Sequence, residues 1–201
     1  MPRVVLLAGP SGSGKSHLAE ASGLPVLTLD DFYRDGTDPA LPRHPELGIV
    51  DWDHAAAWDA HRAVDTLVAI CRDGFADVPV YDISQDRAVR TVRLDVGNAP
   101  VFVAEGLFAG EIAAACRERG ILADALVLRR KPWKNFVRRL VRDLAERRKP
   151  PITLLRRGLA LMRAERAIVQ RQIELGCRSV DAAAVQAALA AISARDSDST
   201  R

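Results

Sequence analysis

A glycine-rich segment near the N-terminus carries the strongest chemical signal in this sequence. Residues 9–16 read GPSGSGKS, which matches the pattern G-x-x-x-x-G-K-[ST]. Glycines let successive backbone N–H groups face one anion, and a lysine and a serine hydroxyl suit phosphate oxygens and Mg²⁺. Lys15 is therefore expected to contact the β- and γ-phosphates of a nucleotide, and Ser16 to contact Mg²⁺. The predicted nucleotide-binding residues are Gly9, Pro10, Ser11, Gly12, Ser13, Gly14, Lys15, Ser16 and His17.

Two acidic residues follow apolar segments that have the composition of buried strands. Asp30 ends the segment 26–29, and Glu105 ends the segment 100–104. In a parallel sheet the carboxyl ends of the strands open onto one crevice, which these acids would share with the glycine-rich loop. Asp30 could accept the proton of an attacking hydroxyl, and Glu105 could hold Mg²⁺ directly or through water. The alternatives are that Asp30 caps a turn and that Glu105 is a solvated loop residue.

A strongly basic segment follows the last predicted central strand. Only Asp143 and Glu146 oppose its ten positive charges, which are Arg129, Arg130, Lys131, Lys134, Arg138, Arg139, Arg142, Arg147, Arg148 and Lys149. Arg138 and Arg142 lie one helical turn apart, so several guanidinium groups can converge on one side of a helix. We interpret residues 133–149 as an arginine-rich lid over the triphosphate. A nucleic-acid-binding face and an ordinary solvated helix are the competing interpretations.

The remaining pattern alternates short apolar strands with helices, which predicts an α/β fold, a P-loop three-layer α/β/α sandwich with a mainly parallel sheet. The predicted strands are 3–8, 26–29, 100–104, 123–128 and 177–180, with a β-hairpin insertion at about 78–95 and a loop at 33–50. The predicted helices are 15–21, 53–72, 111–119, 133–147, 152–175 and 180–194, with Asp53 as the N-cap of the second. His54 is expected at this helix start, and Trp52 and Trp58 are expected to pack. Residues 1–195 would form a single domain, and residues 196–201 a polar tail.

Composition sets the class of protein. The chain has 201 residues, a formal net charge of +3 and a pI near 9.0. This mild basicity is only weak evidence for nucleic acid and fits equally well with a protein that handles anionic phosphates, so a nucleic acid partner is not expected. Its three cysteines have no metal-ligand spacing, which favours free thiols in a reducing, cytoplasmic setting. No apolar stretch is long enough for a membrane span. The sequence leaves the oligomeric state open, including a homo-oligomer.

Several motifs occur in the order and spacing of a known family. They are GPSGSGKS, LDDFYRD (29–35), DWDHAAAWD (51–59), PVYDIS (79–84), VFVAEGLFA (101–109) and RRLVRDLAER (138–147). Together they resemble the uridine kinase branch of the uridine kinase and phosphoribulokinase family, over about residues 4–149. The resemblance implies an ATP- or GTP-dependent, Mg²⁺-requiring kinase that phosphorylates a primary hydroxyl of a small molecule, most simply the 5′-hydroxyl of a nucleoside.

The same resemblance implies roles for individual residues. Asp30 would be the base toward the sugar hydroxyl, and Asp53 would bind the ribose hydroxyls. Glu105 would be the Mg²⁺-linked acid. Tyr33 and Arg34 would line the acceptor pocket, with Tyr81 beside the base. The implied lid is Arg138, Arg139, Arg142 and Arg147, and the implied catalytic set is Asp30, Lys15, Arg138 and Arg142.

Two departures from the family pattern concern the acceptor. Gln85-Asp86-Arg87 stands where uridine kinases have a histidine that reads the pyrimidine, and Asn135 stands in place of an arginine before the lid. The acceptor could therefore be a nucleoside, pantothenate, a sugar or another small alcohol. A different class of function also remains open, a P-loop nucleotide-dependent regulatory protein whose basic helix binds RNA.

Overall fold

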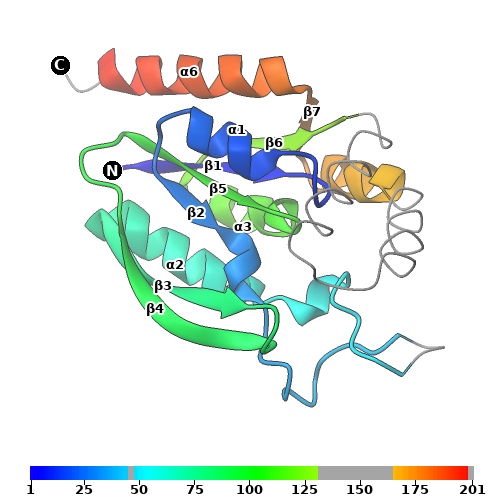
Figure 1. The fold of residues 1–201 in the computed structure, drawn as a ribbon. Helices are drawn as coiled ribbons and strands as arrows, with labels where there is room; N and C mark the ends of the chain where they lie inside the picture. The colour runs from blue at the N-terminus through cyan, green and yellow to red at the C-terminus, as the bar shows by residue number, and fades with distance from the viewer. Residues whose placement is uncertain (45–47, 131–164, 199–201) are drawn as a thin grey trace.

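A five-stranded parallel sheet forms the centre of the molecule (Figure 1). The computed structural model describes residues 1–44, 48–130 and 165–198. The strands are β1 (Arg3–Ala8), β2 (Val26–Thr28), β5 (Val101–Gly106), β6 (Leu122–Leu128) and β7 (Arg178–Val180), in the spatial order β2-β5-β1-β6-β7. Every residue from Val4 to Ala8 is fully buried, as expected for a central strand covered on both faces. The predicted α/β fold with a mainly parallel sheet is confirmed.

Helices cover both faces of this sheet and form two apolar cores. Helices α2 (Ala60–Asp73) and α3 (Ala113–Glu118) lie on one face, and α1 (Lys15–Ala21) and α6 (Ala182–Asp198) lie on the other (Figure 1). Leu67 and Ile70 of α2 belong to the larger core. Leu18 of α1 and Leu189 of α6 belong to the smaller one. Residues 165–174 are also helical, and no helix among the described residues is long and apolar enough to cross a membrane.

The helix predicted to begin at Asp53 begins later, so that prediction is wrong. Asp59 is the N-cap of α2, and its Oδ1 accepts the Arg62 N–H at 3.0 Å. A separate short 3₁₀ turn, η2 (Ala55–Ala57), precedes it, with His54 as its cap. The two helical pieces are separated because Trp58 is extended, with φ −111° and ψ 140°, and its side chain is buried in the core. His54 therefore caps this short turn and not the predicted helix, whereas the expectation that Trp58 packs is confirmed.

Smaller differences concern the ends of other elements. β2 stops at Thr28 because residues 29–32 form a 3₁₀ helix, η1 (Leu29–Phe32). The helix expected from residue 111 is preceded by another 3₁₀ turn, η3 (Ala109–Ile112). Helix α6 continues to Asp198, into the expected polar tail, since its alanine-rich sequence favours helix propagation. The predicted lid and most of the predicted helix 152–175 lie outside the described residues.

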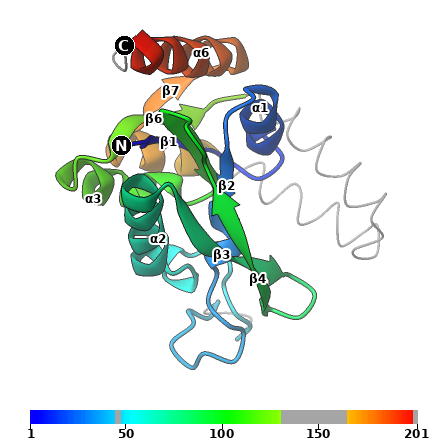
Figure 2. The same ribbon diagram turned by 90° about the vertical axis from the view of Figure 1, so that its left-hand side faces the viewer.

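The predicted hairpin is present and is three residues longer at its start. Strands β3 (Phe75–Asp82) and β4 (Arg87–Asp95) pair antiparallel as a separate two-stranded sheet, with a bulge between Val80 and Tyr81. Ala76 and Val78 of β3 are buried in the larger core, whereas β4 is almost entirely exposed. Figure 2 shows this ribbon crossing beside β2 and extending beyond the central sheet.

Candidate active site

The glycine-rich loop links β1 directly to α1, the context that a phosphate-binding loop requires. Gly12 and Gly14 have φ values of 76° and 90°, which lie in the left-handed region that glycine adopts without strain. Ser13 is buried, and its Oγ has no hydrogen-bond partner among the described residues. His17, in contrast, is exposed on α1. The loop therefore has the backbone form of a phosphate cradle, with a buried polar atom left without a partner.

Glu105 lies at the carboxyl end of β5, beside the start of α1. The Ser16 hydroxyl donates a hydrogen bond of 2.7 Å to Glu105 Oε1, and Lys15 Nζ lies 3.8 Å from Glu105 Oε2. Lys15 and Glu105 are 6% and 3% exposed, so both charges are removed from water. Burial raises the pKa of Glu105, and the Lys15 charge and the Ser16 hydrogen bond lower it in part. The sequence-predicted residues Lys15, Ser16 and Glu105 thus form one contact group.

The chemistry of this group fits a magnesium ion. Glu105 Oε2 is buried and accepts no hydrogen bond from any described residue. A buried carboxylate oxygen without a donor is costly unless another group, such as a cation, completes it. Carboxylate and hydroxyl oxygens are the ligands that Mg²⁺ prefers, directly or through water. Glu105 and Ser16 are therefore suitable residues to hold Mg²⁺ beside a bound phosphate.

Asp30 is fixed to the same end of the sheet. It lies in η1, directly after β2, and Thr28 pairs with Glu105 across the two strands. Its Oδ1 accepts the backbone N–H of Leu107 at 2.9 Å, while no described residue donates to Oδ2. This contact connects Asp30 to the chain two residues beyond Glu105. The two predicted acids are therefore held by neighbouring strands.

Gly106 makes this close approach possible. A Cβ atom at this position would lie 2.9 Å from Asp30 Oδ1 and 2.8 Å from the Leu29 Cβ. Both distances are shorter than real Cβ contacts, so any larger residue would displace η1 and Asp30 with it. The glycine after Glu105 therefore has a steric role that its position in the sequence alone does not reveal.

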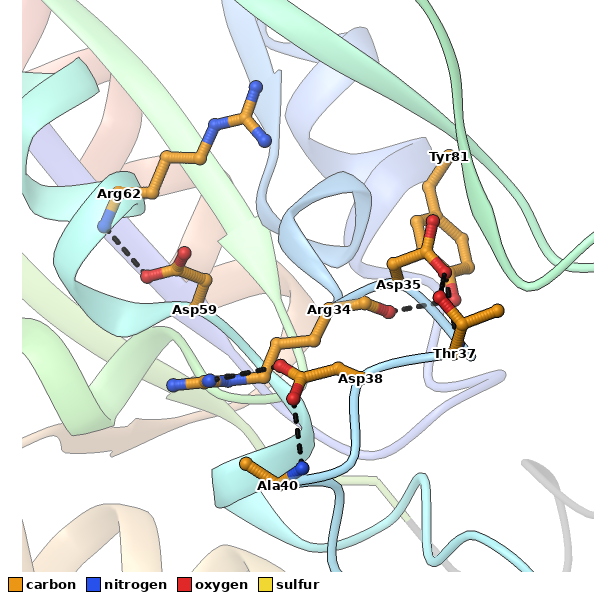
Figure 3. A network of polar contacts seen from close by, with 8 residues as sticks. All are labelled: Arg34, Asp35, Thr37, Asp38, Ala40, Asp59, Arg62 and Tyr81. Carbon is orange, nitrogen blue, oxygen red and sulfur yellow. Dashed lines mark hydrogen bonds and ion pairs between the residues drawn. The ribbon is translucent and has the colours of Figure 1, made fainter.

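The predicted acceptor residues come from the loop after η1 and from the hairpin. The Tyr81 hydroxyl donates to the Arg34 carbonyl at 3.1 Å, as Figure 3 shows. The Tyr33 ring lies 5.8 Å from the Tyr81 ring, centroid to centroid. The Arg34 guanidinium reaches Asp38 at 3.3 Å in a largely exposed ion pair, the kind that contributes little and is easily exchanged for another anion. The structure brings Tyr33, Arg34 and Tyr81 together.

Asp53 is the predicted acceptor residue with the weakest structural connection. It is exposed in the turn before η2, and its backbone N–H donates to Asp51 Oδ1 at 3.2 Å. No described residue hydrogen bonds to its carboxylate. The adjacent Trp52 lies closer to the group, because its ring makes edge contacts with Tyr33 at 5.8 Å and Tyr81 at 6.4 Å. Trp52 therefore packs against other side chains, as predicted, and these side chains are Tyr33 and Tyr81 of the predicted acceptor pocket.

Sequence reasoning missed Asp31, which lies next to Asp30. Its Oδ1 accepts the backbone N–H of Tyr81 at 2.9 Å, a contact between residues 50 positions apart. Burial raises the pKa of Asp31, although the Tyr81 hydrogen bond opposes this effect. The position of Asp31 next to Asp30 in the LDDFYRD segment could have marked it as a candidate site residue. Its partner in the hairpin, the Tyr81 N–H, could not be identified without the fold. The predicted lid arginines, Arg138, Arg139, Arg142 and Arg147, lie outside the described residues.

Comparison with known proteins places the chain among kinases. It is 33% identical to a uridine kinase of Deinococcus deserti over 174 residues, which is 81% of this chain and 78% of that protein. It is 28% identical to a uridine kinase of Geobacillus kaustophilus, over 81% of this chain and 77% of the relative. No protein-family model matches the chain.

A solved structure agrees with the fold. The crystal structure of a putative fructose transport system kinase from Silicibacter sp. TM1040 superposes with a TM-score of 0.57 at 21% identity, covering 85% of both chains. At that identity the likeness concerns the fold alone. The sequence relationship to the Deinococcus enzyme is close enough and long enough to decide the family. This chain belongs to the uridine kinase family of P-loop small-molecule kinases.

Proposed function

We propose that this protein transfers the γ-phosphoryl group of ATP to a primary hydroxyl of a small molecule, most simply the 5′-hydroxyl of a nucleoside. The observation that carries the proposal is the placement of two acids at the carboxyl ends of neighbouring strands, Glu105 in β5 and Asp30 just after β2. Ser16 fixes Glu105 beside the P-loop lysine, and the Leu107 N–H fixes Asp30 at the adjoining strand end. A nucleotide switch would need the first acid, but only a transferase needs the second.

On the donor side, the chain's residues would bind and neutralise phosphate oxygens. The P-loop amides and Lys15 would hold the β- and γ-phosphates, and Ser16 and Glu105 would hold Mg²⁺. When bound, Mg²⁺ supplies charge neutralisation between the phosphates. The arginines of the predicted lid, led by Arg138 and Arg142, would add positive charge as it develops in the transition state. GTP would serve the same groups, since none of them reads the base.

On the acceptor side, Asp30 would orient the hydroxyl and accept its proton. The acceptor oxygen then bonds to the γ-phosphorus while the bond from that phosphorus to the β,γ-bridging oxygen breaks, which releases ADP. Because this transition state is loose, the position of the hydroxyl matters more than the basicity of Asp30. Tyr33, Arg34 and Tyr81 would line the acceptor pocket, and Asp53 would reach ribose hydroxyls when substrate draws its loop inward.

The acceptor itself is tested by a screen. Purified protein is incubated with Mg²⁺, ATP and a panel of nucleosides, sugars, pantothenate and simple alcohols, and phosphorylated products are identified by mass spectrometry. We expect one class of primary alcohol to be phosphorylated and nucleosides to be the best acceptors. A sugar or pantothenate product would keep the chemistry and change the acceptor. Nucleotide binding without any product, together with salt-dependent RNA binding, would instead support the regulatory function.

A further inference from the structure

The hairpin β3–β4 has few attachments to the rest of the molecule. It is a two-stranded sheet of its own, and the described part of the chain supplies no third strand to it. An isolated two-stranded hairpin is marginally stable in water, so its position depends on what it packs against. Near its base, Ala76 and Val78 pack in the larger core, and the Val96 N–H donates to the Gly74 carbonyl at 2.9 Å. The far end needs other attachments.

Three polar contacts attach the far end to the segment 31–36. Asp31 Oδ1 accepts the Tyr81 N–H at 2.9 Å, and the Tyr81 hydroxyl donates to the Arg34 carbonyl at 3.1 Å. The Gly36 N–H donates to the Asp86 carbonyl at 2.6 Å. Figure 3 shows the second of these contacts, with the hydroxyl end of Tyr81 directed at the loop. We call this set of contacts the tip clamp.

Each residue of the tip clamp meets a local geometric requirement. Asp31 receives the Tyr81 N–H at the bulge between Val80 and Tyr81, where the regular strand pairing shifts. Asp86 has a φ of 51°, the left-handed conformation that aspartate tolerates better than most residues. At Gly36 a Cβ atom would lie 2.7 Å from the Cβ of Asp86, a distance that real Cβ atoms do not adopt. The loop and the hairpin tip are therefore in direct backbone contact.

The clamp joins the residues that would touch the acceptor. Asp31 is bonded covalently to Asp30, and Tyr81 and Arg34 are members of both the clamp and the proposed acceptor pocket. Asp30 is fixed on its other side by the Leu107 N–H. Movement of the hairpin tip would therefore displace Tyr81 relative to Asp30 without disturbing the P-loop, which connects β1 to α1.

We propose that Asp31 is a positioning residue that, with the Gly36–Asp86 contact, holds the hairpin tip against the acceptor loop and so sets the width of the acceptor pocket. This inference rests on the proposed function, because it assigns the pocket beside Asp30 to the acceptor. It predicts that loosening the clamp weakens the acceptor's apparent affinity and leaves the nucleotide's unchanged.

Two independent pairs of variants test the clamp. Asp31→Ala removes the acceptor of the Tyr81 N–H, whereas Asp31→Asn retains an oxygen in the same place and serves as its conservative control. Gly36→Ala inserts a methyl group against Asp86, and Gly36→Ala with Asp86→Gly removes the opposing Cβ. Gly36 has no positive φ, so the alanine acts through the steric contact alone. Asp86→Gly by itself is the reference for the double variant.

The first measurement needs no acceptor. Amide hydrogen exchange followed by mass spectrometry is recorded over residues 78–90, with α1 as an internal reference. We expect Asp31→Ala and Gly36→Ala to exchange about tenfold faster than the parent across this segment, and the Asn variant to exchange close to the parent rate. The double variant should exchange more slowly than Gly36→Ala but faster than the parent, because the new methyl group still lies 3.2 Å from the Asp86 carbonyl oxygen. Unchanged exchange in both disruptive variants would overturn the clamp, whatever the enzyme's activity.

The second measurement is the split between kinetic constants. With the best acceptor from the screen, both disruptive variants should raise the acceptor KM by about tenfold while the ATP KM stays within about twofold. The Asn variant should recover most of the loss, and the double variant part of it. Equal effects on both KM values would mean general destabilisation and would contradict a positioning role. If the parent phosphorylates no acceptor, the proposed function fails, and the exchange data alone decide whether the clamp exists.

Discussion

The donor end of the proposed site is held by the central sheet, whereas the acceptor end is held by side chains that reach distant backbone groups. Lys15 begins the helix that follows β1, Glu105 lies at the end of the adjacent strand β5, and each is almost completely buried. Tyr81 and Arg34 are half-buried or exposed and meet through one hydrogen bond between segments 47 positions apart. The donor end is therefore buried and attached to the sheet, whereas the acceptor end depends on a few exposed or half-buried contacts.

Removal of the Lys15 charge from the P-loop changes the donor end and should give the largest loss of activity. We expect Lys15→Ala to lower kcat/KM at least about a hundredfold, because it removes a preorganised charge from a buried site. Lys15→Met keeps the apolar stem of the side chain and should lose as much activity. Circular dichroism should show the fold retained. Turnover close to that of the parent in either variant would refute the P-loop assignment.

Glu105→Gln tests the cost of a buried carboxylate at the same end. Burial raises the pKa of Glu105, so the native state disfavours the charged form, and this penalty grows as pH rises through that pKa. The Gln variant without ligand should therefore melt about 2–4 °C higher than the parent at pH 8, and the gain should shrink toward pH 5. Nucleotide with Mg²⁺ should stabilise the variant much less than the parent.

The matched control is Glu118→Gln, which changes an exposed carboxylate on α3. It should leave the melting temperature and the response to Mg²⁺ as they are in the parent. A Glu105→Gln protein that lost stability at pH 8, yet kept its full response to Mg²⁺ and nucleotide, would show that Glu105 has only a structural role.

Trp58→Phe changes a buried contact at the acceptor end and should affect catalysis less than Lys15→Ala. The Trp58 indole N–H donates to the Leu29 carbonyl at 2.6 Å in the core, directly before Asp30. Its loss leaves a buried carbonyl short of a donor, at about 1–3 kcal/mol, and the melting temperature should fall by several degrees. Trp52→Phe removes an indole for which only ring contacts are found in the described part of the chain, and it should cost less. In Trp58→Phe the acceptor KM should change more than the ATP KM. An equal change in both would contradict the distinction between the donor end and the acceptor end.

The contact group of Lys15, Ser16 and Glu105 could be expected from the sequence because its information is local. A contiguous motif between a strand and a helix defines the loop, and Glu105 could be located as the acid that ends an apolar run. The sheet followed from the same apolar strands. The short 3₁₀ turn η2 was not predictable. The sequence from residue 53 has the pattern of one continuous helix, but Trp58 is extended and buried and interrupts it. Tertiary burial there overrides local helix propensity.

The acceptor end was predictable only as a set of residues. The resemblance named Tyr33, Arg34, Asp53 and Tyr81, but the hydrogen bond from Tyr81 to Arg34 crosses 47 positions of sequence and the one from Tyr81 to Asp31 crosses 50. No periodicity or residue spacing in the sequence indicates the hydrogen bond between Asp31 and Tyr81. The same holds for the steric requirement for glycine at position 106, beside Asp30. Such contacts depend on how the hairpin lies against η1, which is a property of the fold.

Asp30→Asn, assayed in a single turnover beside a nucleotide-binding measurement, tests the central claim most directly. Asparagine keeps an oxygen for the Leu107 N–H but cannot take the acceptor's proton. With the preferred acceptor and saturating Mg²⁺ and ATP, the rate of phosphoryl transfer should fall at least about a hundredfold, while the Kd for ATP stays within about twofold of the parent. A variant that transfers the phosphoryl group at the parent rate would show that Asp30 only caps η1, and would contradict the proposed site.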